Sequence, residues 1–268
     1  MVSFYLEPSS KREGGMDEVL FSIDEGEGRI TINRPEKSNA LNPNVLHQLC
    51  QTIRMAGEDP NVRVLTISGA GEKVFCAGMD LKTTLLAESS GRGFDRTNFR
   101  QLLLDIAYCA KPTIALARGH VMGGGLGIVL ACDLCIACDD VHFSTPEILV
   151  GMFPMMVLGL LYRNVGRKKA TELMLLGERI SAMQAQQFGI INHAYPRNRF
   201  QTESSELVRK LADKSPAILL LGKKAISQTL DRTLPQEEEF LESALAGVLN
   251  TDDSKKGIRA FVEKKRIT

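Results

Sequence analysis

The order of short apolar stretches and helical segments is the feature that most constrains the fold of this chain. Between residues 19 and 145, runs typical of strands, such as residues 62–68, 112–117 and 134–138, alternate with segments of helical periodicity. From residue 203 onward the pattern is almost entirely helical, with breaks only near prolines. Alternation of this kind favours the α/β class. We therefore expect an α/β core followed by a helical C-terminal region.

Local signals mark the first elements of the core. Residues 19–24 and 29–33 alternate apolar and polar side chains and are joined by Glu-Gly-Glu-Gly, a pattern that predicts a β-hairpin. Asn42 followed by Pro43 is typical of the N-cap and first residue of a helix. Asp59-Pro60 is expected to end that helix.

Further along, two short helices and one longer helix are indicated. Residues 102–109 and 128–131 have helical patterns, the second as the continuation of a glycine-rich segment. Residues 168–176 form a third helical stretch, and Gly177 follows it at the position where a C-cap is expected.

The composition argues against two classes of function. The 268 residues carry a formal net charge of +1, and the Lys and Arg residues are scattered. Binding of nucleic acid or of a membrane surface usually leaves a basic stripe. The most apolar run, residues 148–162, is broken by Pro154 and is shorter than the roughly 20 residues of a membrane span. We therefore expect neither a nucleic acid nor a membrane as a partner.

The chain is expected to have three parts. Residues 1–15 lack the apolar stretch of a signal peptide and are interpreted as a flexible extension. Residues 16–200 are expected to form the core, and residues 201–268 the helical C-terminal region. The six cysteines do not occur in a small, loop-rich secreted context, so we expect reduced thiols and a cytoplasmic protein.

Three of the cysteines have the spacing of an iron–sulfur ligand run. Cys132, Cys135 and Cys138 are each separated by two residues, but Asp139 and Asp140 follow them, and the fourth Cys and the Pro of the fuller pattern are absent. The residues between them are largely apolar, and unpaired cysteine is among the most buried residue types. We interpret the three as structural. The four histidines also lack ligand spacing, so no metal is expected.

Two glycine-containing junctions could expose backbone N–H groups. In residues 74–81 an extended run reaches Gly78 and a helix begins at Asp80, which leaves the Met79 N–H without an acceptor inside the helix. In residues 119–127 a strand leads into a glycine run that opens a helix, a geometry that favours an anion. The second junction lacks both common phosphate-binding motifs, so an oxyanion fits better than a phosphate. A plain turn and close helix packing are the alternative interpretations.

Glu147 is the candidate for proton transfer. It follows Pro146 and precedes three aliphatic residues. In apolar surroundings a carboxyl group resists ionisation, and its pKa rises toward the range that is useful in catalysis. The alternative is a glutamate that stabilises the first turn of a helix.

The order and spacing of these motifs resemble the crotonase superfamily, which includes enoyl-CoA hydratases and isomerases. The resemblance covers about residues 19–265. The matching stretches are NRPEKSNALN (33–42), FCAGMD (75–80), GHVMGGGLG (119–127) with ACD (131–133), PEILVG (146–151), RISA (179–182) with Ala185 and Gly189, and FVEKK (261–265).

The resemblance implies a crotonase-like spiral of ββα turns with a helical C-terminal part that mediates homotrimers, often paired into hexamers. It also implies an acyl-CoA thioester as substrate, with no cofactor beyond the coenzyme A of that substrate. Two backbone N–H groups would polarise the thioester carbonyl, and they correspond to Met79 and Gly124. Glu147 would be the acid/base. The expected contacts to coenzyme A are Lys37, Ala40, Leu41, Ala77, Asp80 and, from a neighbouring subunit, Lys264.

The chain departs from the hydratase pattern at one position. Hydratases that it resembles usually carry two glutamates, and the first of these corresponds to Gly127. Adding water usually uses two carboxylates, whereas one base can move a double bond from position 3 to position 2. The sequence therefore favours an isomerase. The alternatives are a hydratase that uses another group or a water, and a coenzyme A-binding protein without catalysis; a role in RNA binding is disfavoured by the neutral charge.

A carboxylate introduced at position 127 is expected to restore the two-acid arrangement. The obstacle would be steric, since Met155 or Met156 could already fill the space beside the glycine. The stripe formed by Met155, Met156 and Val157 is interpreted as lining of the acyl pocket or as a subunit contact, with plain core packing as an equal alternative.

Overall fold

The computed structural model describes residues 17–83, 96–229 and 233–263. Its strands form two sheets, one of six strands in the order β1-β2-β3-β5-β7-β10 and one of four strands in the order β4-β6-β8-β9. The strands are β1 Val19–Asp24, β2 Glu27–Ile32, β3 Val64–Gly69, β4 Val74–Cys76, β5 Thr113–Ala117, β6 His120–Met122, β7 Leu134–Cys138, β8 His142–Ser144, β9 Ile180–Ser181 and β10 His193–Tyr195.

From β3 to β8, successive strands alternate between the two sheets. β3, β5 and β7 are parallel neighbours in the large sheet, while β4, β6 and β8 are parallel neighbours in the small one. Each of β3, β5 and β7 is followed by a strand of the small sheet and then by a helix, so this part of the chain advances by one ββα unit per turn. This arrangement confirms the expected α/β class and the spiral of ββα turns.

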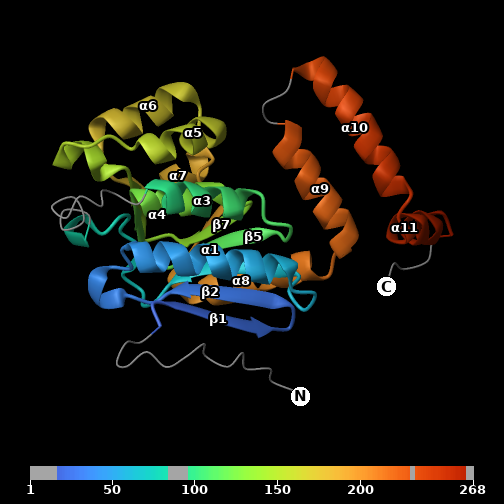
Figure 1. The fold of residues 1–268 in the computed structure, drawn as a ribbon, viewed down its shortest axis with the longest axis horizontal. Coiled ribbons are helices and arrows are strands. Elements are labelled where there is room, and N and C mark those ends of the chain that lie inside the picture. The colour runs from blue at the N-terminus through green and yellow to red at the C-terminus, as the bar shows by residue number, and fades with distance from the viewer. Residues whose placement is uncertain (1–16, 84–95, 230–232, 264–268) are drawn as a thin grey trace.

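The helices cover the sheets and extend to one side of them (Figure 1). The α-helices are α1 Pro43–Glu58, α3 Arg96–Ala107, α4 Gly124–Ala131, α5 Met155–Asn164, α6 Arg167–Leu176, α7 Ala182–Phe188, α8 Arg197–Ala212, α9 Pro216–Thr229, α10 Leu234–Leu249 and α11 Asp252–Val262. Two short 3-10 helices, η1 Pro35–Lys37 and η2 Pro146–Val150, precede α1 and α5.

The expected hairpin and first helix are both present. β1 and β2 pair antiparallel through a turn of only two residues, Glu25 and Gly26, whose φ angles are +48° and +84°. The turn is shorter than the four residues that the sequence suggested, because Glu27 and Gly28 already pair in the ladder. The side chain of Asn42 accepts a hydrogen bond from the Val45 N–H at 2.7 Å, as expected of an N-cap.

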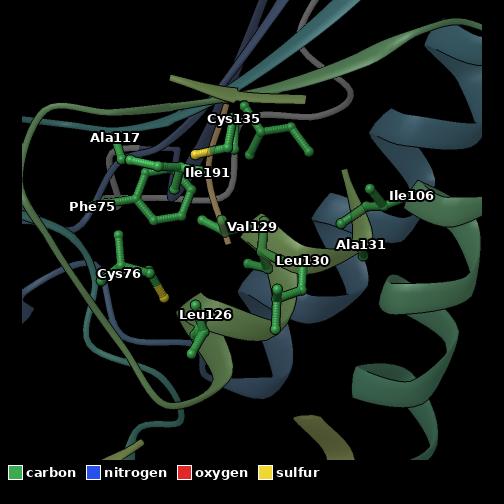
Figure 2. Close-up of a cluster of buried hydrophobic side chains, with 14 of the residues drawn as sticks. Phe75, Cys76, Ile106, Ala117, Leu126, Val129, Leu130, Ala131, Cys135 and Ile191 are labelled. Carbon is green, nitrogen blue, oxygen red and sulfur yellow. The ribbon is translucent and has the colours of Figure 1, made fainter. Parts of the chain in front are cut away.

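Helix α4 begins at Gly124, inside the glycine run that was expected to open a helix. Glycine is a poor helix former, so local preference alone does not favour this start. All eight of its residues are buried, so packing overrides the local preference. Figure 2 shows how α4 is enclosed, with side chains from several elements around it. The labelled side chains are Leu126, Val129, Leu130 and Ala131 of α4 and, around them, Phe75, Cys76, Ile106, Ala117, Cys135 and Ile191.

The helices after residue 200 differ in how they pack. α8, which spans the boundary expected at residues 200/201, buries Phe200, Ser204 and Val208 and contacts β7. In α10 and α11 no described residue is buried. α9 and α10 contact each other and lie beside the core (Figure 1). α10 and α11 therefore present apolar side chains outward, including Leu245 of α10 and Phe261 of α11.

The three closely spaced cysteines are packed inside the protein. Cys135 and Cys138 are buried in β7, and Cys132 follows α4 as its C-cap. Burial raises the pKa of all three thiols. None of the six cysteines, all of which lie in the described residues, forms a disulfide. None of the helices in the described part of the chain has the length and apolar character needed to cross a membrane.

Candidate active site

The loop after η1 lies alongside the segment that contains Met79. The Ala77 N–H donates to the Ser38 carbonyl at 3.0 Å, and the Leu41 N–H donates to the Gly78 carbonyl at 2.8 Å. The Asp80 N–H donates back to the Leu41 carbonyl at 2.9 Å. The last two of these bonds use the peptides on either side of Met79, through the Gly78 carbonyl and the Asp80 N–H. In residues 17–83, 96–229 and 233–263 the Met79 N–H itself has no acceptor.

The second candidate donor lies at the first residue of α4. Gly123 has a φ of +52° and donates its N–H to the Ser144 carbonyl at 3.0 Å. The next N–H, that of Gly124, has no acceptor among the described residues, as expected at a helix start. A Cβ on Gly78, whose φ is +89°, would lie 2.9 Å from the Gly124 nitrogen. Glycine at position 78 therefore lets the two donor segments touch, and the structure brings Met79 and Gly124 together.

Glu147 lies against the same glycine run. It is the second residue of η2, and its Oε1 is 3.0 Å from the position that a Cβ on Gly123 would take. Its Oε2 is buried and has no hydrogen-bond partner among the described residues. Burial raises the pKa of Glu147, an effect that a hydrogen bond from its own backbone N–H partly offsets. The carboxyl group thus lies beside Gly123, the residue before the Gly124 donor, with one oxygen available for a proton.

The residues expected to contact coenzyme A lie mostly in one place. Lys37 is exposed at the end of η1, while Ala40 and Leu41 are buried in the loop that pairs with residues 77–80. Ala77 is half-buried in that pairing. Lys264 lies outside the described residues, so its expected contact stays a prediction, as do the others.

Asp80 has contacts within the chain. Its Oδ1 accepts from the Thr83 N–H at 3.2 Å, and its Oδ2 lies 3.3 Å from two nitrogens of Arg34. Burial opposes ionisation of Asp80, but these two donors outweigh it and lower the pKa of the carboxyl. No local signal in the sequence indicates a role for Arg34 in the site, although it lies inside one of the stretches that carry the resemblance.

A second residue of that stretch, Asn39, also contributes to the site. Its side chain is fully buried, with a φ of +52°, and its Nδ2 donates to the Ala70 and Val74 carbonyls at 3.0 and 2.8 Å. Its Oδ1 accepts from the Arg34 N–H at 3.0 Å. Asn39 therefore fixes the loop against the ends of β3 and β4, a role that only the three-dimensional arrangement reveals.

Position 127 faces an apolar surface. A Cβ on Gly127 would lie 3.3 Å from Leu103, 3.4 Å from Phe99 and 3.4 Å from Val157. The first two side chains come from α3 and the third from α5. The expectation that Met155 or Met156 fills this space is corrected, since Val157 is the α5 residue nearest the glycine and Met155 is 70% exposed.

Comparison with known proteins identifies the family of this chain. The family model for enoyl-CoA hydratase/isomerase matches residues 22–268. A mitochondrial enoyl-CoA hydratase of Pongo abelii is 31% identical over 240 residues, covering 89% of this chain and 82% of the relative. A probable enoyl-CoA hydratase of Mycobacterium bovis is 30% identical and covers 92% of this chain and 95% of its own length.

Solved structures give the same picture for the fold. Human enoyl coenzyme A hydratase domain-containing protein 3 superposes with a TM-score of 0.88 at 28% identity, covering 94% of this chain and 99% of that structure. An enoyl-CoA hydratase of Mycobacterium smegmatis gives a TM-score of 0.86 at 29% identity, with 94% and 99% coverage. The chain belongs to the enoyl-CoA hydratase/isomerase family of the crotonase superfamily.

Proposed function

We propose that this protein is an enoyl-CoA isomerase that moves a double bond from position 3 to position 2, with Glu147 as its single acid/base. The observation that carries the proposal is the surroundings of position 127. A glycine stands there, and three apolar side chains surround the place of its missing Cβ. Hydration would use a second carboxylate to orient water. Position 127 has no side chain to carry that carboxylate, and its surroundings are apolar.

The reaction follows from the arrangement of donors and base. Glu147 takes a proton from C2 of a 3-enoyl-CoA, and the electron pair of that C–H bond moves onto the thioester carbonyl. The N–H groups of Met79 and Gly124 stabilise the resulting enolate oxygen, and each such donor is worth about 10²–10³ in kcat. Glu147 then returns the proton at C4, which leaves the double bond between C2 and C3. Protons and electrons balance with the base alone, so the reaction needs no cofactor beyond the coenzyme A of the substrate.

The coenzyme A part of the substrate is assigned to the loop that carries the Met79 segment. Its proposed contacts are Lys37, Ala40, Leu41, Ala77 and Asp80, together with Lys264 of a neighbouring subunit. The exposure of Lys37 beside the buried Ala40 and Leu41 supports a binding edge at this loop.

Hydration of a 2-enoyl-CoA is the second candidate, favoured by the names of the Pongo abelii and Mycobacterium bovis relatives. The two reactions are separated by assaying a 2-enoyl-CoA and a 3-enoyl-CoA of equal chain length side by side. The isomerase proposal expects turnover of the 3-enoyl-CoA and little hydration. High hydratase turnover by the unmodified protein would refute it. If the unmodified protein turned over neither ester, the result would instead support a coenzyme A-binding protein without catalysis.

Assembly and compartment are further parts of the proposal. The apolar side chains that α10 and α11 expose support a homotrimer or homohexamer built through the helical C-terminal region. The six cysteines, none of which forms a disulfide, support a reducing compartment such as the cytoplasm. Light scattering of the purified protein measures the molar mass, and a monomer would contradict the first statement.

A further inference from the structure

The direction of the Met79 N–H is set by a loop. Leu41 bonds to the peptides on both sides of Met79, and the two residues form an isolated parallel bridge. In such a bridge the bonds run through the flanking peptides, so the residue between them turns its own N–H to the opposite side. The Met79 N–H therefore points away from Leu41. How firmly it is held depends on the residues that fix Leu41 and Asp80.

The guanidinium group of Arg34 contacts the residues next to both of these peptides. Its Nη1 donates to the Ala40 carbonyl at 2.6 Å, directly before Leu41. Nη1 and Nη2 each lie 3.3 Å from Oδ2 of Asp80, directly after Met79. The side chain of Arg34 is 10% exposed, so water competes little for these bonds.

Two carboxylates complete the arrangement. The Nε of Arg34 lies 2.7 Å from Oε1 of Glu18, and that carboxylate also accepts from the Nδ2 groups of Asn42, at 2.9 Å, and Asn44, at 2.6 Å. Glu18 thus anchors the guanidinium group to the start of α1. Asp80 in turn accepts the Thr83 N–H, which orients its carboxylate toward Arg34. A lysine carries one ammonium group and lacks the planar fork that reaches three acceptors at once.

We propose that Arg34 is a positioning residue of the reaction: through Ala40 and Asp80 it directs the Met79 N–H at the enolate oxygen. Arg34 acts through its neighbours and is assigned no contact with the substrate. The inference rests on the proposed role of Met79 as a donor to the enolate. It adds a requirement that the donor alone does not have, namely an intact ion pair behind it.

The test uses one variant that keeps the positive charge at position 34 and one that keeps the acceptor at position 80. Arg34→Lys keeps the positive charge, and Asp80→Asn keeps an acceptor for the Thr83 N–H. The matched control is Arg63→Lys, because Arg63 also donates to backbone carbonyls, those of Ala212 and Lys214 at 2.6 and 2.8 Å, but on α8 and the residues after it. The probe is acetoacetyl-CoA, a 3-ketoacyl-CoA without a double bond to move or hydrate, whose enolate absorbs in the near ultraviolet.

Two readouts are compared: the enolate absorbance of the bound probe, and kcat and KM with a 3-enoyl-CoA. We expect both variants to lose most of the enolate band and about ten- to a hundredfold in kcat, with the KM of Arg34→Lys changing less than about threefold. Arg63→Lys should keep the band and kcat. Thermal unfolding shows whether each variant is folded. If Arg34→Lys is not folded, the Asp80→Asn variant alone tests the positioning role.

The outcomes separate this inference from the proposed function. Folded Arg34→Lys or Asp80→Asn protein with an unchanged enolate band overturns the positioning role, whatever reaction the enzyme performs. If the unmodified protein binds the probe without any enolate band, the oxyanion role of Met79 is wrong and the inference falls with it. A band that Arg63→Lys reduces equally would show a general structural effect and also overturn the proposal.

Discussion

The two backbone donors of the site are held in place by different kinds of interaction. Gly124 opens a helix whose eight residues are all buried among apolar side chains. Met79 lies in a loop that is fixed by backbone hydrogen bonds and by the ion pair between Arg34 and Asp80. Apolar packing is sensitive to volume, because protein interiors are close-packed. An ion pair is sensitive to charge and pH. The two halves of one site should therefore respond to different perturbations.

The largest expected effect is on the packed side. Gly124→Pro removes the donor while fitting the first position of a helix, where proline is well tolerated. Activity should fall by about 10²–10³ or more, because one oxyanion donor is lost. Gly124→Ala is the matched control: it keeps the N–H but places a Cβ 3.1 Å from the Phe99 ring. Steady-state kinetics of both variants separate the donor from the volume. A fully active, folded Gly124→Pro variant would remove this donor from the mechanism.

Replacement of the base should have a comparable effect on rate, but a different effect on stability. Glu147→Gln should lower kcat by about 10²–10⁴ while substrate binding persists. The raised pKa of Glu147 means that the folded state binds its proton more tightly than the unfolded state. Stability is therefore lost as pH rises through the interval between the unfolded and folded pKa values.

The same variant then gives a second measurement. Since glutamine carries no charge to desolvate, Glu147→Gln should be at least as stable as the unmodified protein at neutral pH. Chemical denaturation at neutral pH tests this. For the unmodified enzyme, kcat/KM should rise with pH through a pKa above the ordinary glutamate value. A marked loss of stability in the variant, or near-normal turnover, would argue against Glu147 as the base.

The comparison also explains what the sequence could predict. Glycines at strand–helix junctions and a glutamate before aliphatic residues are local signals, so both donors and the base could be proposed from residues 74–81, 119–127 and 146–151. The interactions that hold Met79 are not local. Arg34 and Asp80 are 46 residues apart, and Asn39 reaches carbonyls 31 and 35 residues away. Charged residues of either sign are common along the chain, and only the fold determines which of them meet.

The same reasoning applies to the fold itself. The long elements were indicated by periodicity and caps, as for α1 with Asn42 as N-cap. The short strands β9 and β10, of two and three residues, carry too few side chains to show a pattern. The glycines at the start of α4 allow a close approach to another element: a Cβ on Gly125 would lie 2.5 Å from the Cys76 carbonyl oxygen.

A smaller effect is expected at position 127, where the structure changes the expectation from sequence. Gly127→Glu would direct a carboxylate toward Phe99, Leu103 and Val157, where it resists ionisation and disturbs packing. We expect a loss of about 1–3 kcal/mol of stability and no hydratase activity. Gly127→Ala, which adds only the Cβ, should remain close to the unmodified protein.

Making room should change this result. In Gly127→Glu combined with Leu103→Ala, hydration of a short 2-enoyl-CoA should become measurable, because the shortened side chain admits the carboxylate and a water. Assays of hydration and isomerisation on the single and double variants test the idea. Strong hydration by Gly127→Glu alone would show that the apolar surface does not exclude the second acid.

The smallest effect is expected from pH acting on the polar side. The folded-state pKa of Asp80 is lowered, so its ion pair contributes stability that is fully present above the unfolded-state value of about 3.9. That contribution is lost as pH falls through the folded pKa, which lies below this value.

The stability difference between the unmodified protein and Asp80→Asn should therefore be constant near neutral pH and shrink below about pH 4. The control is Arg63→Lys, because Arg63 donates to the backbone carbonyls of Ala212 and Lys214. Its stability difference from the unmodified protein should not follow this pH profile. Denaturant unfolding of the three proteins between neutral pH and pH 3 measures both differences. If the Asp80→Asn difference persists unchanged at the lowest pH, the carboxylate is not what holds the Met79 loop, and the contrast between the two donors loses its electrostatic half.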